Sequence, residues 1–327
     1  MNRREWMTGM GMAAVLQPAE RVVVVGDVHG DYERFMEVLI MAGVANRQVN
    51  WTGGATQLIQ IGDMLHRGPQ SRRALDALIR LQEQAKRAGG LVEMALGNHE
   101  ILRMTGDYRH VSPGEYAEFR TPNSPRERDA YFETYLEKLR YEGGEFGRPE
   151  LTIGFRQRWE ASFPLGRAEM IKAFGERGTY GRWLRKRPVA LVAGESLILH
   201  AGVSPKYLSW DSERFADRFR REIGAFPHVN LDAYLADPLG PFWWRGAALQ
   251  PEAELAGHIE DLLARWRVRR MVVGHTPQKG QVTPRFGGRV LLADVGLSSL
   301  YTGARACLVL ERGRAVMLLE DKPVQLP

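Results

Sequence analysis

The feature that most constrains this chain is a set of short apolar runs that each end in a polar cluster containing glycine. The runs cover residues 22–25, 58–61, 91–96, 197–199 and 271–273. Such runs, rich in Val, Ile and Leu and bounded by Gly, predict buried strands. Amphipathic segments at 32–42 and 71–88 separate the first three runs. The alternation predicts an α/β fold with a largely parallel, right-handed sheet, whose polar clusters lie at the carboxyl ends of the strands.

The rest of the chain divides into two further regions. Residues 290–292, 306–311 and 315–319 predict closely spaced strands, and the last two form an antiparallel hairpin. Residues from about 103 to 187 are charged and aromatic, with helical patterns near 127–139 and 168–175. We interpret this region as a mostly helical insertion, packed beside the sheet as a cap over the rim of the site. It belongs to one domain that spans residues 20–327.

Composition excludes several classes of protein. The single Cys307 excludes a disulfide framework within one chain and a cysteine-rich zinc site. The net charge of +6 is dispersed among residues of both signs, so we expect no nucleic-acid partner. After the N-terminal segment, no apolar stretch approaches the ~18 residues that a membrane-spanning helix needs.

The N-terminal segment 1–19 resembles an export signal. Arg3 and Arg4 precede an apolar stretch from Thr8 to Leu16, and Pro18-Ala19 follows just before the first strand. This order is typical of a secretory leader, and the paired arginine indicates twin-arginine export to the periplasm. Gln17 fits a cleavage signal poorly. The alternative is an amphipathic or disordered start of a cytoplasmic protein.

The polar clusters supply residues that bind metal ions. Asp27 and His29 stand two apart at a strand end, so both side chains can reach one ion. Asp63 follows the second strand and can bridge two ions through its two oxygens. We assign Asp27, His29 and Asp63 to the first ion; the second would be held by Asp63, Asn98, His200 and His275. Mixed oxygen and nitrogen ligands without thiolate suit Mn, Fe or Zn. Two such ions about 3.5–4 Å apart can clamp an in-line displacement.

Each ligand taken singly has a simpler interpretation. A histidine after an apolar run is usually structural, and Asp or Asn beside Gly is usually part of a turn. Five strand ends that each supply a hard or borderline ligand make coincidence a poor explanation. His110, His228 and His258 stand in polar or loop-like surroundings and carry no comparable argument.

These motifs resemble the phosphoprotein phosphatase family of calcineurin-like metallophosphoesterases. The resemblance rests on Gly26-Asp27-Val28-His29-Gly30, Gly62-Asp63 with Arg67-Gly68, Gly97-Asn98-His99-Glu100, His200-Ala201-Gly202 and Gly274-His275. Trp244-Arg245-Gly246, Thr276-Pro277-Gln278 and Asp294-Val295-Gly296 are similar to the Shewanella-like branch. The resemblance implies a four-layer αββα sandwich with a dinuclear metal centre.

The resemblance also implies roles for individual residues. Arg67 and Arg245 would hold the phosphate oxygens, with Asn98 as a further contact to the substrate. His99 would act as the general acid that protonates the leaving oxygen. A metal-bridging hydroxide would attack phosphorus directly, without a covalent intermediate on the enzyme.

Two positions depart from the family pattern. His66 stands where the family usually has an Asp that orients the proton-donating histidine. Either His66 takes over this task as a neutral group, or His99 is a poorer acid in this chain. Thr276-Pro277 stands where the nuclease and phosphodiesterase branch places a further histidine, which makes that branch a weaker match.

The leading function predicted from these residues is a metal-dependent phosphomonoesterase that acts on phosphorylated protein or a small phosphate ester. It would use two divalent ions, Mn in the first place, with Fe or Zn as alternatives. The sequence leaves open the preference for Ser, Thr or Tyr and the oligomeric state. One alternative is a symmetrical diadenosine tetraphosphate hydrolase, because that branch also lacks the second-motif Asp. The other is a non-catalytic phosphate-binding protein.

Overall fold

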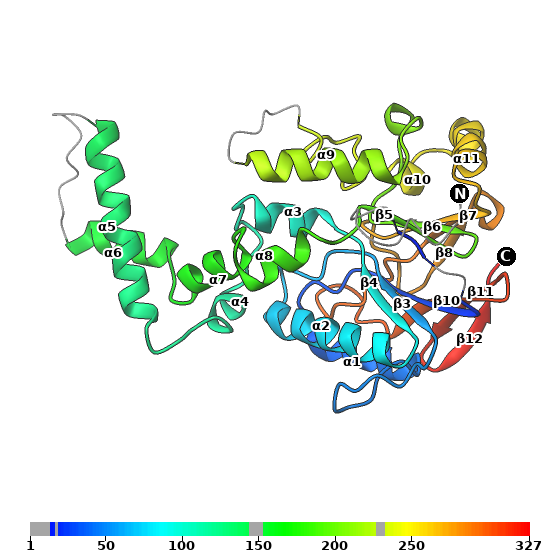
Figure 1. The fold of residues 1–327 in the computed structure, drawn as a ribbon, viewed down its shortest axis with the longest axis horizontal. Coiled ribbons are helices and arrows are strands. Elements are labelled where there is room, and N and C mark those ends of the chain that lie inside the picture. The colour runs from blue at the N-terminus through cyan, green and yellow to red at the C-terminus, as the bar shows by residue number, and fades with distance from the viewer. Residues whose placement is uncertain (1–13, 17–18, 144–152, 227–232) are drawn as a thin grey trace.

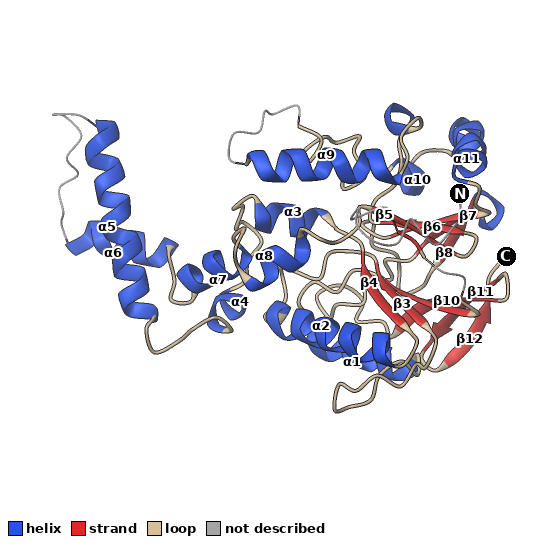
Figure 2. Ribbon diagram, in the orientation of Figure 1, coloured by secondary structure: helices blue, strands red, loops and turns tan. Residues whose placement is uncertain are grey.

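The computed structural model describes residues 14–16, 19–143, 153–226 and 233–327. This part of the chain forms two six-stranded sheets that pack face to face, with helices on the outer face of each (Figures 1 and 2). The architecture is the four-layer αββα sandwich implied by the resemblance, so the predicted fold class is confirmed.

The first sheet contains the strands of the predicted βαβαβ unit. Its order is β12-β11-β10-β2-β3-β4. The strands are β2 (Arg21–Val25), β3 (Gln57–Gln60), β4 (Leu91–Met94), β10 (Ala306–Glu311), β11 (Arg314–Leu319) and β12 (Lys322–Gln325). β2, β3 and β4 are parallel, whereas β10 and β11 form the predicted antiparallel hairpin. The Val side chains of β2 are almost fully buried, because both faces of this sheet are covered.

The second sheet holds the other two polar clusters, so the clusters do not share one sheet. Its order is β1-β5-β6-β7-β9-β8. The strands are β1 (Ala14–Val15), β5 (Ala190–Ala193), β6 (Ser196–Leu199), β7 (Arg270–Val273), β8 (Thr283–Arg285) and β9 (Val290–Leu292). Although β9 stands near the C-terminal hairpin in sequence, it pairs in parallel with β7 instead. The two sheets place their cluster-bearing strand ends on the same side of the sandwich (Figure 1).

Amphipathic helices cover both sheets. The helices α1 (Tyr32–Met41) and α2 (Ser71–Arg87) lie on the first sheet, where α2 buries Leu75, Leu78 and Leu81. The second sheet is covered by α9 (Ser212–Ala225), α10 (Gly246–Leu249) and α11 (Glu252–Trp266). Short 3-10 turns are formed by Pro205–Tyr207 and Phe286–Gly288. Buried side chains of both sheets and their helices form one continuous apolar core.

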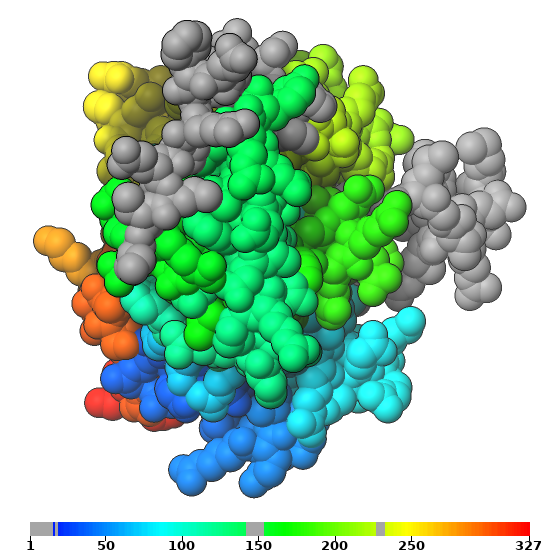
Figure 3. Space-filling model, turned by 90° about the vertical axis from the view of Figure 1, so that its left-hand side faces the viewer, coloured from blue at the N-terminus to red at the C-terminus, as the bar shows by residue number. Residues whose placement is uncertain are grey.

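The region between β4 and β5 is helical in its described residues. It contains α3 (Asn98–Met104), α4 (Pro113–Ala117), α5 (Ser124–Gly143), α6 (Ile153–Ser162), α7 (Arg167–Phe174) and α8 (Thr179–Leu184). The pair α5 and α6 extends away from the sandwich as an arm (Figure 1), which projects toward the viewer in Figure 3. Aromatic contacts hold the pair together: the Phe132 and Trp159 ring centres lie 4.9 Å apart, with the ring planes tilted by 55°. This outer part therefore does not cover the site as the expected cap would.

Most of the expected export signal lies outside the described residues. Residues 14–16 and 19 are described, and of these Ala14–Val15 pairs in parallel with β5 at the edge of the second sheet. None of the described helices combines the length and the apolar character that crossing a membrane would require.

Gly166, the residue before α7, is in a position that only glycine fits without strain. Gly166 has a φ of +93°, and a Cβ atom there would overlap the carbonyl oxygen of Tyr116. We expect Gly166→Ala to lower the free energy of unfolding by about 1–3 kcal/mol. Gly257 is the control because it lies exposed in α11 with open space around it, so Gly257→Ala should add about 0.5–1 kcal/mol. Urea denaturation measures both; shifts of the same sign would contradict the constraint.

Candidate functional site

The loops that follow the parallel strands carry the predicted site residues on strained backbone. Asp27 and His29 follow β2, Asp63 follows β3, and His275 follows β7. His29, Asp63 and His275 have positive φ values of 49°, 56° and 64°. His66 and Arg67, which follow Asp63 in the same loop, also have positive φ values, of 71° each. Such conformations are uncommon for non-glycine residues and concentrate at functional sites. Three predicted ligands and one predicted arginine therefore have conformations that the surrounding structure must hold in place.

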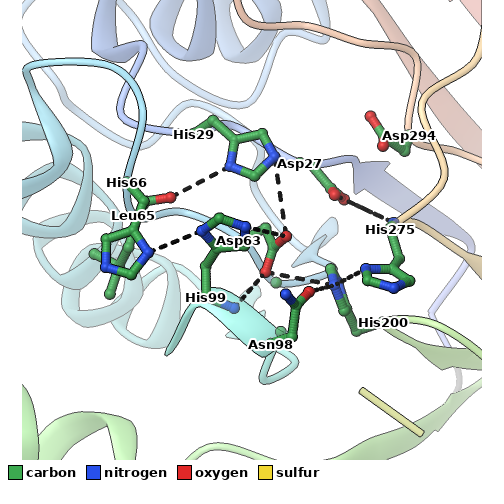
Figure 4. A network of polar contacts seen from close by, with 12 residues as sticks. Asp27, His29, Asp63, Leu65, His66, Asn98, His99, His200, His275 and Asp294 are labelled. Carbon is green, nitrogen blue, oxygen red and sulfur yellow. Dashed lines mark hydrogen bonds and ion pairs between the residues drawn. The ribbon is translucent and has the colours of Figure 1, made fainter. Parts of the chain in front are cut away.

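Asp63 lies at the centre of the site, where the two sheets meet (Figure 4). Its Oδ2 atom is 3.9 Å from His29 Nε2 and 3.8 Å from His99 Nε2. Its Oδ1 atom is 3.4 Å from His200 Nε2 and accepts a hydrogen bond from the His99 backbone N–H. One carboxylate therefore faces imidazoles on both of its oxygens, as a bridging ligand would.

The remaining predicted ligands complete the second side of the site. His200 Nε2 lies 2.9 Å from Asn98 Oδ1 and 3.1 Å from His275 Nδ1. The carboxylate of Asp27 accepts the His275 backbone N–H at 3.2 Å. The structure thus brings all six predicted ligands into one buried network (Figure 4).

Two groups in this network have the spacing of metal sites. Asp63, His200 and His275 form one, and His29, Asp63 and His99 form the other, with ligand atoms within 4.8 Å of one another. The sequence grouped Asp27 with His29 and Asp63, whereas the geometry places His99 beside that pair. Asp27 lies outside both groups and joins the network through His275.

Buried carboxylates give the site a need for positive charge. Burial, Asp294 and Asp63 raise the pKa of Asp27 well above its usual value. Burial also raises the pKa of Asp294 to about 6 and that of Glu100 to about 7. Among the described residues, Asp294 Oδ2 has no hydrogen-bond partner. A cation would relieve this crowding of negative charge, so the donor set fits divalent metal ions.

The histidines present unprotonated ring nitrogens that can bind metal. Burial lowers the pKa of His29 to about 4, that of His99 to about 3 and that of His275 to about 2. His200 differs: burial opposes its charged form, but Asp63, the Ile61 carbonyl and Glu100 together outweigh burial and raise its pKa. Burial likewise opposes ionisation of Asp63, but His200 and His99 lower its pKa well below the usual value.

Glu100 fixes the loops that carry these ligands. Its carboxylate accepts the backbone N–H groups of Asp63 at 2.8 Å, Met64 at 3.0 Å and Gly97 at 2.9 Å. One buried side chain at the start of α3 thereby joins the loop after β3 to the loop after β4. The sequence showed Glu100 only as the last residue of the Gly97-Asn98-His99-Glu100 motif. Its hydrogen bonds to the loop after β3 could not be predicted, because they depend on the tertiary fold.

The two predicted arginines border the same cavity as the metal-binding groups. This cavity of about 220 Å³ is lined by His29, Asp63, Asn98, His99 and His275 and also by Arg67 and Arg245. Arg245 donates from Nη1 to the His275 carbonyl oxygen and to Thr276 Oγ1. The guanidinium of Arg67 lies 5.4 Å from the ring centre of Tyr301. Both arginines are exposed, and both line the cavity.

Further residues at the cavity were missed by sequence reasoning. Trp243, Tyr301, Arg109 and His110 also line it. The sequence offered no argument for placing His110 at the site, but it lies beside His99 with ring centres 5.3 Å apart. In the sequence, His110 was marked only by its position in the loop after α3, which does not by itself indicate a site residue. Chain folding, which places the Arg67 N–H on the His110 carbonyl oxygen, brings it to the site.

Comparison with known proteins assigns the family. A family model for calcineurin-like phosphoesterases matches residues 20–279. The chain belongs to the calcineurin-like phosphoesterase family. The match includes all six predicted ligands and both arginines, and the resemblance seen in the sequence is confirmed.

Relatives and solved structures agree with this family. Shewanella-like protein phosphatase 2 of Arabidopsis thaliana is 29% identical over 318 residues, which cover 93% of this chain and 78% of that protein. An uncharacterized protein of Schizosaccharomyces pombe is 29% identical over 91% of this chain and 80% of its own length. The cold-active protein-tyrosine phosphatase of a psychrophilic Shewanella species has a TM-score of 0.70 at 23% identity, covering 100% of this chain and 89% of that one. That likeness shows the shared fold.

The raised pKa values predict a pH-dependent metal affinity. Without metal, Asp27 and His200 keep their protons to a higher pH than usual, whereas metal binding requires them deprotonated. Affinity for Mn²⁺ should therefore rise with pH until both groups have lost their protons. Calorimetry in buffers of different ionisation enthalpy should show more protons released at about pH 6 than at about pH 8. Binding without proton release at the lower pH would contradict the prediction.

Proposed function

We propose that this phosphoesterase is a metal-dependent phosphomonoesterase that acts on phosphorylated protein. The observation that carries the proposal is one cavity in which Arg67 and Arg245 face the two groups of metal-binding residues around Asp63. The family supplies the reaction class, and the similarity to Shewanella-like protein phosphatase 2 of Arabidopsis supports phosphoprotein as the substrate. The preference among phosphoserine, phosphothreonine and phosphotyrosine stays open.

Two divalent ions, Mn in the first place with Fe or Zn as alternatives, are part of the proposal. Asp63 would bridge them, with Asp27 and His29 on one side and Asn98, His200 and His275 on the other. When bound, the ions would acidify a water molecule and offset charge on the phosphoryl group. Neutral imidazoles and closely packed carboxylates support the binding of divalent ions through nitrogen and oxygen ligands.

The residues of the chain have separate tasks in this reaction. Arg67 and Arg245 would bind the phosphate oxygens through paired N–H groups and hold the ester in line. The amide N–H of Asn98 would contact a phosphate oxygen while its Oδ1 atom faces the second metal group. His99, whose Nε2 atom points toward Asp63, would contact the leaving oxygen. Asn98 and His99 are buried, which strengthens their electrostatic contacts.

A substrate panel tests the proposed function. Mn-loaded protein should hydrolyse 4-nitrophenyl phosphate and phosphopeptides, measured by phosphate release. Asp63→Asn, which removes the bridging charge, should reduce the rate by at least about 100-fold. Turnover of diadenosine tetraphosphate alone would replace the proposal with the symmetrical hydrolase alternative. Rates no higher than those of Asp63→Asn on every substrate would favour the non-catalytic, phosphate-binding alternative.

Arg245 gives a second test of the same site. Lysine keeps the charge but loses the paired N–H groups, so Arg245→Lys should lower kcat/KM for aryl phosphates by about 10–100-fold. Arg47 is exposed and distant in the fold, which makes Arg47→Lys a matched control with unchanged kinetics. Steady-state kinetics measure both variants. Equal kinetics for Arg245→Lys and wild type would show that Arg245 does not bind the phosphate group.

We also propose export to the periplasm through the twin-arginine route, with the cytoplasm as the alternative. The support is the sequence order of Arg3-Arg4, the apolar stretch and Pro18-Ala19. Mass spectrometry of the protein from its native cells decides between them. A mature N-terminus near Glu20 supports export, and an intact N-terminus in the cytoplasmic fraction contradicts it.

A further inference from the structure

A chain of four buried polar side chains leads from the helical region to the site. Glu115 and Arg103 lie on α4 and α3, His66 lies in the loop after β3, and His99 lies at the start of α3. Their exposed fractions are 0%, 1%, 0% and 3%. His66 Nδ1 lies 2.8 Å from His99 Nδ1, a contact drawn in Figure 4. Buried polar groups at such distances are hydrogen-bonded, so the position of each proton can be deduced.

Arg103 must be a donor in this chain, because a guanidinium donates hydrogen bonds and never accepts them. Its Nε–H group points at His66 Nε2 at 3.1 Å. Its Nη2 atom is held 2.7 Å from Glu115 Oε1, and its Cζ atom lies 4.7 Å from the ring centre of Phe174. Arg103 therefore cannot turn away easily. His66 Nε2 must be the acceptor and carries no proton.

The proton of neutral His66 is consequently on Nδ1, which faces His99. His66 Nδ1–H donates to His99 Nδ1, and that atom of His99 is the acceptor. The ring proton of His99 then lies on Nε2, the nitrogen 3.8 Å from Asp63 Oδ2. An aspartate at position 66 would do the reverse, because a carboxylate only accepts and would require a proton on His99 Nδ1.

We propose that Arg103 and His66 are positioning residues that hold His99 as a neutral imidazole with its Nε2–H group facing the substrate. The part of the proposal that concerns catalysis rests on the proposed function. His99 then stabilises the leaving group as a hydrogen-bond donor, a role that neutral imidazole can fill. When the bond from phosphorus to the leaving oxygen breaks, the electron pair stays on that oxygen. The oxygen is held by His99 Nε2–H and afterwards takes a proton from water.

Nitrogen NMR tests the proton positions directly and does not depend on catalysis. The probe is ¹⁵N-histidine-labelled protein loaded with Zn²⁺, a d¹⁰ ion. In the wild type we expect the Nδ1–H tautomer for His66 and the Nε2–H tautomer for His99. In His66→Asp we expect a proton on His99 Nδ1. A wild-type His99 that carries its proton on Nδ1 would overturn the proposal, whatever the activity.

Kinetics with a series of aryl phosphates test the consequence for catalysis. Wild-type kcat should fall steeply from 2,4-dinitrophenyl to phenyl phosphate, because no proton is transferred to the more basic leaving oxygen. His66→Asp should raise kcat for phenyl phosphate about tenfold relative to the dinitrophenyl ester, since His99 can then carry a second proton to transfer. An equal change for both esters would overturn the assigned role.

A matched pair of arginine variants separates positioning from folding. Arg103→Met frees His66 Nε2, so His99 should show a mixture of tautomers and a changed ratio of kcat between the two esters. Arg187 is also buried in a pair with a glutamate, Glu93, lies over the Trp183 ring and is not among the residues that line the site's cavity. Arg187→Met should lower stability without changing the tautomers or the ratio. If both variants changed the His99 tautomers and the kcat ratio in the same way, Arg103 would have only a structural role and the proposal would be contradicted.

Discussion

The burial of the Asp63 carboxylate between the two sheets is the constraint on which the rest of the site depends. A carboxylate in this position is stable only if donors or cations surround it. His29 and His99 approach it from the first sheet and His200 from the second. Divalent ions would satisfy the same demand more fully, because Asp27, Glu100 and Asp294 crowd further negative charge into the same space.

The polar network behind the site explains how the loops keep their strained conformations. Glu100 binds the N–H groups of Asp63, Met64 and Gly97, so the loops after β3 and β4 are fixed to one side chain. Arg103, from the same helix, joins this network to Glu115 on α4. Helix α3 therefore acts as the connection between the metal-binding residues and the helical region, while the arm of α5 and α6 extends away from the site.

Much of the fold and of the metal-binding network could be predicted from the sequence. Alternating buried strands and amphipathic helices predicted β2, α1, β3, α2 and β4, because burial imposes a period on the apolar side chains. The polar clusters predicted the ligands, because parallel strands end on one side of a sheet. The sequence could not show that β9 pairs with β7 or that His110 borders the cavity, since both depend on contacts between distant segments.

The sequence by itself determined which side chains are available: the six ligands, Arg67 and Arg245, and the unusual His66. It also posed the question of what His66 does, and left two answers open. Only the tertiary structure places Arg103 and Glu115 behind His66, from helices that share no motif with it. The physical reason is that hydrogen bonds have a direction. A donor brought from elsewhere in the fold decides which nitrogen of each ring holds the proton.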